Sequence, residues 1–167
     1  MKSGTSIEPF LPSDWESVRS IYADGIADGQ ATFETAVPTW EQWDSATLKV
    51  CRLVAKHDRE VIGWATLKPV STRECYSGVA EVTIYVAAEW RGHGVGKLLL
   101  EHLILESEKN GIWTLQGSTF PENVASIRLQ QSCGFRIVGR REKVAQQNGV
   151  WRDTVLTERR SRVAGTE

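Results

Sequence analysis

The stretch "YVAAEWRGHGVGKLLLEHL", residues 85–103, joins an apolar β-type run to an apolar helical run through a loop with three alternating glycines. Gly92, Gly94 and Gly96 let the main chain turn tightly and approach a ligand with no Cβ in the way. Free N–H groups and the helix dipole at the start of the following helix favour a phosphate or pyrophosphate. The stretch therefore predicts a strand, an anion-binding loop and a helix, in that order.

Three other interpretations of this loop can be weighed from its spacing. A triphosphate-binding Walker loop needs serine or threonine after its lysine, but Lys97 is followed by Leu98. A dinucleotide-binding loop has the spacing G-x-G-x-x-G after the first strand of a parallel sheet, whereas this loop reads G-x-G-x-G and follows several strands. A glycine-rich turn without any ligand stays open on the glycines alone. The charged side chains of Arg91, His93 and Lys97 favour an anion site.

Upstream of the loop, the pattern predicts a strand at residues 6–11 and then two helices. Ser13 and Glu16 have the spacing of a capping box for the first helix, and Thr39 and Gln42 repeat it for a second helix that ends at about Leu48. Residues 29–38 have no period and are expected to form a loop. Two β-type runs then flank a charged turn at residues 57–60, which is typical of a hairpin.

Downstream, the helix after the loop is expected to end at Asn110 and Gly111, and residues 112–120 form a further strand. Asn123 or Pro121 begins another helix, which ends at Gly134. The run "FRIVGR" follows Gly134, and a final hairpin with its turn at residues 148–149 completes the chain. The expected order is strand, two helices, three strands, helix, strand, helix and two strands.

This order predicts an α/β fold with a mixed sheet covered by helices. The chain has 167 residues, of which 41% are hydrophobic, so it is long enough to bury one core without disulfides. No repeat or linker divides it, and we expect a single domain over residues 1–167. The polar tails, about residues 1–5 and 159–167, are expected to be mobile.

Composition excludes several classes of function. The 20 basic and 21 acidic side chains give a net charge of −1, whereas a nucleic-acid-binding protein usually has a marked positive excess. No apolar run reaches the roughly 18 residues of a membrane span, and the first residues lack the apolar stretch of a signal peptide. Cys51, Cys75 and Cys133 are expected to be reduced packing residues. We therefore expect a cytoplasmic protein that binds neither nucleic acid nor membrane.

Four further segments accompany the glycine loop: "ATFETAVPTWEQW" (31–43), "RECYSGVAEVTIYV" (73–86), "PENVASIRLQQSCGF" (121–135) and "NGVWRD" (148–153). With them, the loop resembles the acyl-CoA-binding signature R/Q-x-x-G-x-G/A of the GNAT N-acetyltransferases. Within that superfamily the chain resembles the phosphinothricin and methionine sulfoximine acetyltransferase group. The resemblance covers nearly the whole chain and implies a central mixed, largely antiparallel sheet flanked by about four helices.

The resemblance also implies how acetyl-CoA, the acetyl donor, is bound. The strand before the loop is bulged in the family and separates from its neighbour, and its free amides bind the pantetheine arm and the thioester carbonyl. Loop amides hold the pyrophosphate, and an asparagine of the next helix contacts the cofactor. The implied cofactor-binding residues here are Ile84, Tyr85, Val86, Arg91, Gly92, His93, Gly94, Val95, Gly96, Lys97 and Asn123, with no metal ligand.

Glu81 matches the family position of the group that accepts a proton from the amine, directly or through water. Because an amine arrives largely as ammonium, it must lose a proton before it attacks the thioester. An exposed carboxylate at a strand edge is the alternative interpretation. Implied acceptor-binding residues are Phe33, Glu34, Arg73, Tyr76, Glu81 and Thr83. Arg73 can equally be an exposed loop residue, and Trp151 can line the pocket, pack in the core or contact a second subunit.

One position departs from the family pattern: Gln130 stands where relatives commonly have histidine, and glutamine does not titrate near neutrality. The resemblance implies an enzyme that acetylates the amino group of a small amino-acid-like acceptor, such as phosphinothricin, methionine sulfoximine or methionine sulfone. Alternatives are an acetyltransferase of a polypeptide or polyamine amine, and a non-catalytic module that binds CoA. The resemblance further implies a homodimer.

Overall fold

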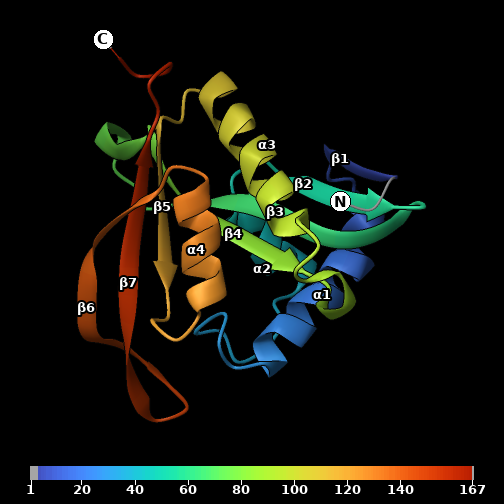
Figure 1. The fold of residues 1–167 in the computed structure, drawn as a ribbon, viewed down its shortest axis with the longest axis horizontal. Coiled ribbons are helices and arrows are strands. Elements are labelled where there is room, and N and C mark those ends of the chain that lie inside the picture. The colour runs from blue at the N-terminus through green and yellow to red at the C-terminus, as the bar shows by residue number, and fades with distance from the viewer. Residues whose placement is uncertain (1–3, 167) are drawn as a thin grey trace.

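A seven-stranded sheet forms the centre of the computed structural model, which describes residues 4–166 (Figure 1). Its strand order is β1-β2-β3-β4-β5-β7-β6. Neighbouring strands are antiparallel except for the parallel pair β4 and β5. The strands are β1 (Thr5–Pro9), β2 (Leu53–His57), β3 (Glu60–Pro69), β4 (Val79–Val86), β5 (Thr114–Thr119), β6 (Arg136–Gln147) and β7 (Val150–Arg160).

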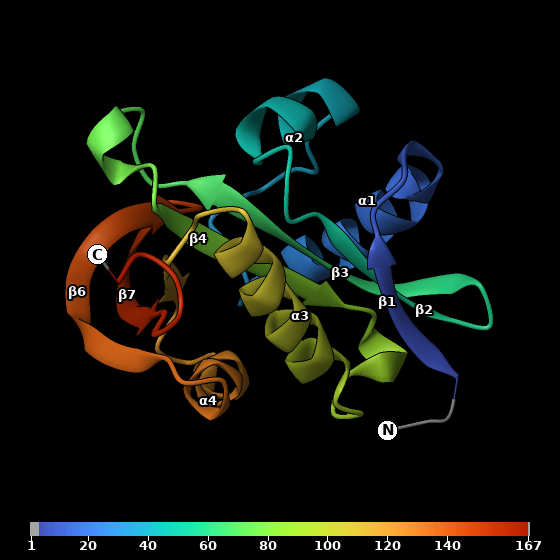
Figure 2. The same cartoon turned by 90° about the horizontal axis from the view of Figure 1, so that it is seen from above.

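Helices cover both faces of this sheet. Figure 2 shows α1 and α2 on one side of the sheet and α3 and α4 on the other. The helices are α1 (Trp15–Ala27), α2 (Trp40–Ala46), α3 (Val95–Lys109) and α4 (Val124–Ser132). The order of strands and helices and the mixed, largely antiparallel sheet confirm the predicted fold class. None of the helices in the described part of the chain is long and apolar enough to cross a membrane.

Each face of the sheet has its own hydrophobic core. Under α3 the core is aliphatic, and Leu99, Leu100 and Leu103 are fully buried against the sheet. Burying each such side chain stabilises the fold by about 1.5–3 kcal/mol. Under α1 and α2 the core is aromatic, and Trp64 stacks on Tyr85 with ring centroids 5.0 Å apart. The two cores hold β3 and β4 rigidly between them.

The observed ends of the elements differ from the expected ones at three places. Ser13 and Glu16 form no capping box, because a 3-10 turn at Pro12–Asp14 precedes α1 and the Asp14 carboxylate accepts a hydrogen bond from the Leu11 N–H at 2.9 Å. The second helix ends at Ala46. In the tails, Thr5 lies in β1, and β7 continues to Arg160 with Ser161 buried behind it. Residues 1–3 and 167 of the predicted tails lie outside the described residues.

The parallel pair β4 and β5 separates after three residues. Val79–Glu81 pair with Thr114–Gln116, and the pairing ends there. β5 instead stays paired with β7 as far as Thr119. β4 remains paired with β3 in unbroken register from Ala80 to Val86, so the predicted bulge in this strand was wrong. The strand keeps its regular form because the separation is made by β5, which follows β7.

Candidate functional site

The separation of β4 and β5 opens a cavity of about 770 Å³, which lies within the range of small-molecule sites. α4, the glycine loop and the loop after α1 form its other walls. Most of the residues predicted for the site line this cavity. They are Phe33, Glu34, Glu81, Thr83, Ile84, Tyr85, Val86, Arg91, Gly92, Gly94, Gly96, Lys97 and Asn123.

The glycine loop forms one end of the cavity. Gly92 and Gly94 have φ angles of 76° and 84°, in the left-handed region that favours glycine. Gly94 is the N-cap of α3 and supplies no side-chain acceptor, so the first N–H groups of the helix remain available. Arg91 lies beside them and forms an ion pair with Asp28 at 2.7 Å. These features fit an anionic group at the helix start.

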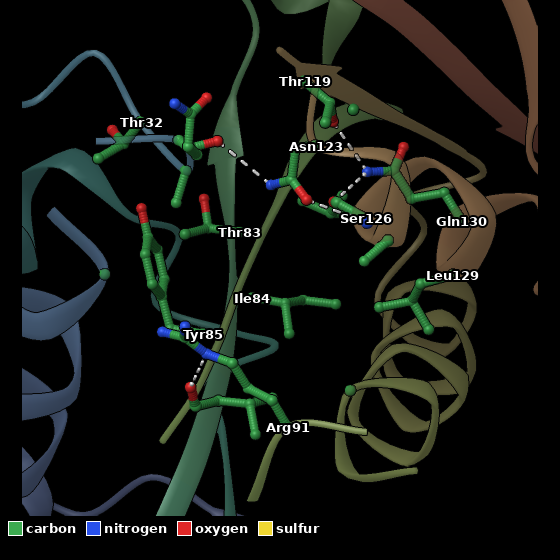
Figure 3. Close-up of a pocket in the computed structure, with 18 of the residues that line it drawn as sticks. Thr32, Thr83, Ile84, Tyr85, Arg91, Thr119, Asn123, Ser126, Leu129 and Gln130 are labelled. Atoms are coloured by element: carbon green, nitrogen blue, oxygen red, sulfur yellow. Dashed lines mark hydrogen bonds between the residues drawn. The ribbon is translucent and has the colours of Figure 1, made fainter. Parts of the chain in front are cut away.

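β4 forms the floor of the cavity, and its side chains alternate between the two faces of the sheet. Ile84 packs on the aliphatic core, whereas Tyr85 packs in the aromatic core. Figure 3 shows Ile84 pointing toward Leu129, and Thr83 and Tyr85 pointing toward Thr32. Since β5 leaves β4 after Glu81, the main chain beyond that residue has no strand partner on this side within residues 4–166.

Glu81 lies where β4 and β5 separate. Its Oε2 accepts a hydrogen bond from Gln116 Nε2 of β5 at 3.3 Å. On the neighbouring strand β3, the residue paired with Glu81 is Lys68, which also lines the cavity. The structure thus places Glu81 at the opposite end of the free β4 edge from the glycine loop. Lys68 and Gln116 were missed by sequence reasoning, since their contacts depend on register and not on any motif.

Two buried tyrosines line the cavity near Glu34. The rings of Tyr22 and Tyr85 have centroids 4.8 Å apart. Burial raises the pKa of Tyr22 to about 12, with the Glu34 charge acting in the same direction and a hydrogen bond with Thr32 opposing it. Burial likewise raises the pKa of Tyr85 above its ordinary value. Both phenols therefore stay protonated at neutral pH and can donate hydrogen bonds.

Hydrogen bonds from the β6–β7 hairpin hold the loop after α1 against the cavity. Arg152 of β7 donates to the carbonyl oxygen of Gly29 at 2.9 Å, and its guanidinium lies 3.6 Å from the centroid of the Phe120 ring. Phe33 packs edge-on against the same ring at 4.7 Å. Gln147 donates to the carbonyl of Thr32 at 2.8 Å. Sequence reasoning missed Arg152 and Gln147, although "NGVWRD" contains the arginine.

Asn123 joins the same loop to α4. Its side-chain oxygen accepts from the Ser126 N–H at 3.2 Å and caps α4, as predicted for the helix start. Its Nδ2 donates to the carbonyl oxygen of Gln30 at 3.3 Å (Figure 3). Asn123 thus lines the cavity and orders its wall, and its side chain already has protein partners.

Gln130, at the position of the family histidine, is buried in a polar network (Figure 3). Its Nε2 donates to Thr119 Oγ1 at 3.1 Å and to Ser126 Oγ at 3.2 Å. Its Oε1 accepts a hydrogen bond from Thr157. Because both ends of the amide are engaged and the amide does not titrate, Gln130 positions the two hydroxyl groups at the cavity wall.

Several predicted residues do not line the cavity. Arg73 and Tyr76 lie in an exposed turn, where the guanidinium is 5.6 Å from the tyrosine ring centroid. His93 is exposed and contacts the Arg91 carbonyl oxygen at 3.0 Å, and the Val95 side chain is buried in the aliphatic core. Trp151 is 57% exposed. Among residues 4–166 there is no group of three metal-ligating side chains.

The chain is similar to a family model, to curated relatives and to solved structures. The acetyltransferase (GNAT) family model matches residues 15–135. A phosphinothricin N-acetyltransferase of Alcaligenes faecalis is 32% identical over 153 residues, which cover 87% of this chain and 77% of that protein. An L-methionine sulfoximine/L-methionine sulfone acetyltransferase of Pseudomonas paraeruginosa is 29% identical over 147 residues, which cover 84% of this chain and 86% of that protein.

A solved structure with a similar fold is a GNAT superfamily phosphinothricin acetyltransferase from Sinorhizobium meliloti in complex with acetyl-CoA. It matches with a TM-score of 0.88 and 25% identity, covering 98% of this chain and 91% of that chain. The span of the family model includes the glycine loop, Glu81 and Asn123.

Proposed function

Because the chain belongs to the acetyltransferase (GNAT) family, we propose that it moves the acetyl group of acetyl-CoA to the α-amino group of a small amino-acid-like acceptor. The reaction class and the acetyl donor follow from the family. The acceptor class rests on similar proteins that are named for phosphinothricin and for methionine sulfoximine or sulfone. The observation that carries the proposal is the cavity between β4 and β5, which has an anion-binding loop at one end and Glu81 at the other.

The residues of the cavity fit the shape and charge of acetyl-CoA. The main chain of Arg91–Lys97 holds the pyrophosphate, because the first N–H groups of α3 and the helix dipole favour an anion there. The unpaired edge of β4 around Ile84–Val86 binds the pantetheine arm, whose amides need such partners. An N–H of this unpaired β4 edge stabilises the negative charge that develops on the thioester carbonyl oxygen.

Glu81 removes the proton that prevents the amine from attacking. The carboxylate accepts a proton from the acceptor ammonium, directly or through one water molecule. The neutral nitrogen then forms a bond to the thioester carbon, and the carbon–sulfur bond breaks as the CoA thiolate leaves with its electron pair. The nitrogen gives up its second proton to this thiolate, so the products are the neutral amide and the CoA thiol, and Glu81 returns its proton to water. The hydrogen bond from Gln116 fixes the Glu81 side chain for this transfer. Holding amine and thioester in contact supplies a large part of the rate acceleration.

The loop over the cavity favours a small acceptor over a polypeptide. The loop at residues 29–34 lines the cavity and is held by hydrogen bonds from Arg152 and Gln147. Phe33 and Glu34 of this loop line the cavity together with Tyr22. A small amino acid fits beneath such a loop, whereas a polypeptide amine needs an open groove to admit the rest of its chain.

Release of free CoA thiol tests the proposal directly. The protein is incubated with acetyl-CoA and, separately, L-phosphinothricin, L-methionine sulfoximine, L-methionine sulfone, spermidine and a peptide with a free N-terminus. We expect turnover with the amino acids and little with the other two. Faster turnover of the peptide would make the chain a polypeptide acetyltransferase. Tight acetyl-CoA binding without turnover of any amine would make it a non-catalytic module.

We also propose that the chain forms a homodimer in the cytoplasm. β6 lies at the edge of the sheet, and such an edge carries free N–H and C=O groups that can pair with a second chain. Exposed apolar side chains lie at both ends of the β6–β7 hairpin, with Val138 of β6 44% exposed and Trp151 of β7 57% exposed. Cys51, Cys75 and Cys133 are free thiols, which fits a reducing compartment.

A further inference from the structure

Lys68 of β3 lines the cavity, and neither the family resemblance nor the mechanism above gives it a role. It is paired directly with Glu81 across the antiparallel strands β3 and β4. Directly opposed residues project from the same face of a sheet, with Cβ atoms about 4.5–5.5 Å apart. The Lys68 side chain therefore leaves the sheet on the face that bears Glu81.

The charge of Lys68 has no protein partner in the described part of the chain. No carboxylate lies within 4.0 Å of its Nζ among residues 4–166, whereas Lys49, Lys56, Lys97 and Lys109 each have such a partner. Its own cross-strand partner, Glu81, accepts a hydrogen bond from Gln116 instead. Lys68 is partly buried at the cavity wall, where an opposite charge on a ligand can pair with its ammonium group. The cavity thus contains a positive charge available to a ligand.

The charges around Lys68 match those of an α-amino acid. Such an acceptor carries an ammonium and a carboxylate group on one carbon atom, so its two charges need opposite partners only a few ångströms apart. Glu81 provides negative charge for the ammonium group, and Lys68 provides positive charge directly opposite Glu81 on the same face of the sheet. Arg73, which the family resemblance implied for the carboxylate, lies against Tyr76 outside the cavity.

We propose that Lys68 binds the α-carboxylate of the acceptor and so makes the enzyme selective for amino acids over simple amines. The proposal rests on the proposed function and adds the group that recognises the acid. Its ammonium group donates charge-assisted hydrogen bonds to the carboxylate, while Glu81 receives the proton of the neighbouring amine. An acceptor that lacks the carboxylate leaves Lys68 unpaired. Such an acceptor binds more weakly, because it does not form the charge-assisted hydrogen bonds.

Kinetics with two matched acceptors test the role of Lys68. L-methionine sulfone carries the carboxylate, and its α-carboxamide has nearly the same shape without the charge. We expect Lys68→Met to raise the KM for L-methionine sulfone by about 10- to 100-fold with little change in kcat, because one charged hydrogen-bonding partner is lost. The KM for the carboxamide should stay the same. Lys68→Arg should retain most of the affinity for the acid, and Lys109→Met, at the far end of α3, should behave as the wild type.

An equal effect of Lys68→Met on both acceptors, or no effect on either, overturns the proposal and leaves the acetyltransferase activity intact. Calorimetry with acetyl-CoA shows whether the variant is folded, since the glycine loop is distant from Lys68 in the cavity. Failure of the wild type to acetylate any amine contradicts the proposed function instead. Calorimetric titration of L-methionine sulfone into the CoA complex then decides on Lys68. Binding that is lost in Lys68→Met supports the proposal, whereas equal binding or no binding overturns it.

Discussion

Glu81 is the residue on which the chemistry depends most. We expect Glu81→Gln to lower kcat by about 100-fold or more at neutral pH, because the amide can hold the hydrogen bond with Gln116 and cannot accept a proton. The loss should become smaller as the pH rises, since more of the acceptor amine is then already neutral. Initial rates of thiol release between pH 6.5 and pH 9.5 measure both effects.

The matched control is Glu60→Gln, which changes the same type of side chain at the exposed first residue of β3. It should leave kcat and its pH dependence unchanged. A Glu81→Gln variant with wild-type kcat would show that another group takes the proton.

Tyr22 links the ionisation of a buried phenol to stability. Its pKa is raised from 10.0 to about 12 by burial, so the folded chain keeps a proton that the unfolded chain loses at high pH. The contribution of protonated Tyr22 to the free energy of unfolding is therefore fully present below pH 10 and is lost as the pH rises through about 12. Between pH 9 and pH 11 the free energy of unfolding should fall by about 1 kcal/mol on account of Tyr22.

Urea unfolding of the wild type and of Tyr22→Phe at pH 9 and pH 11 checks this prediction. The variant should lose less stability over this interval than the wild type. If both lose the same free energy, Tyr22 titrates alike in the folded and unfolded states.

At this scale, residues predicted from a motif mostly line the cavity, whereas residues placed there by a distant contact were missed. Glu81 was predicted from the segment that precedes the glycine loop. Lys68 and Gln116 were not, because their positions beside Glu81 depend on the register of β3 and β5. Arg73 was predicted in the site because its segment matches, yet the turn at residues 74–76 carries it away from the cavity.

At the scale of elements, the glycine loop determines how α3 begins. Gly94 has a φ angle of 84°, which costs an L-residue roughly 1–2 kcal/mol. Gly94→Ala should therefore lower the free energy of unfolding by about that amount. It should also weaken acetyl-CoA binding, because the N–H groups at the start of α3 are displaced from the pyrophosphate. Urea unfolding and calorimetry measure the two effects.

Gly149→Ala provides the matched control for the loop. Gly149 has a similar φ angle of 80° and lies in the exposed β6–β7 turn away from the cavity. We expect a similar loss of stability with unchanged acetyl-CoA affinity. Equal acetyl-CoA affinity in both variants would contradict the role of the loop.

The helices were predictable where capping residues mark their first residues in the sequence. Thr39 and Gln42 form the capping box that begins α2, and Asn123 caps α4. The Ser13 signal was misleading because Asp14, one residue later, bonds back to the Leu11 N–H and extends the helix start into a 3-10 turn. Which of two adjacent residues caps the helix depends on the conformation of the chain before it. The spacing of residues in the sequence does not show that conformation.

At the scale of the whole molecule, the order of elements and the mixed sheet were predicted, but the way in which the sheet opens was assigned to the wrong strand. The resemblance implied a bulge in β4, whereas β4 is regular and β5 leaves it by following β7. The hydrogen bond from Arg152 to the loop at residues 29–34 also joins segments that lie more than 100 residues apart in the sequence. Neither feature has a local signal.

The proposed homodimer gives a prediction for the assembled molecule. Sedimentation equilibrium should yield twice the chain mass of 18.7 kDa. A double variant, Val138→Glu with Trp151→Glu, should sediment as a monomer, because it introduces charge on the exposed apolar side chains of β6 and β7. Val163→Glu, on a more exposed apolar residue of the C-terminal segment, should remain dimeric. A wild-type monomer would contradict the proposal.

A crystal structure of the protein with coenzyme A and L-methionine sulfone tests the central claim most directly. We predict the diphosphate on the main-chain N–H groups of residues 91–97, the sulfur at the separation of β4 and β5, and the acceptor amine beside the Glu81 carboxylate. A diphosphate bound elsewhere, or a Glu81 carboxylate that faces away from both sulfur and amine, would contradict the account.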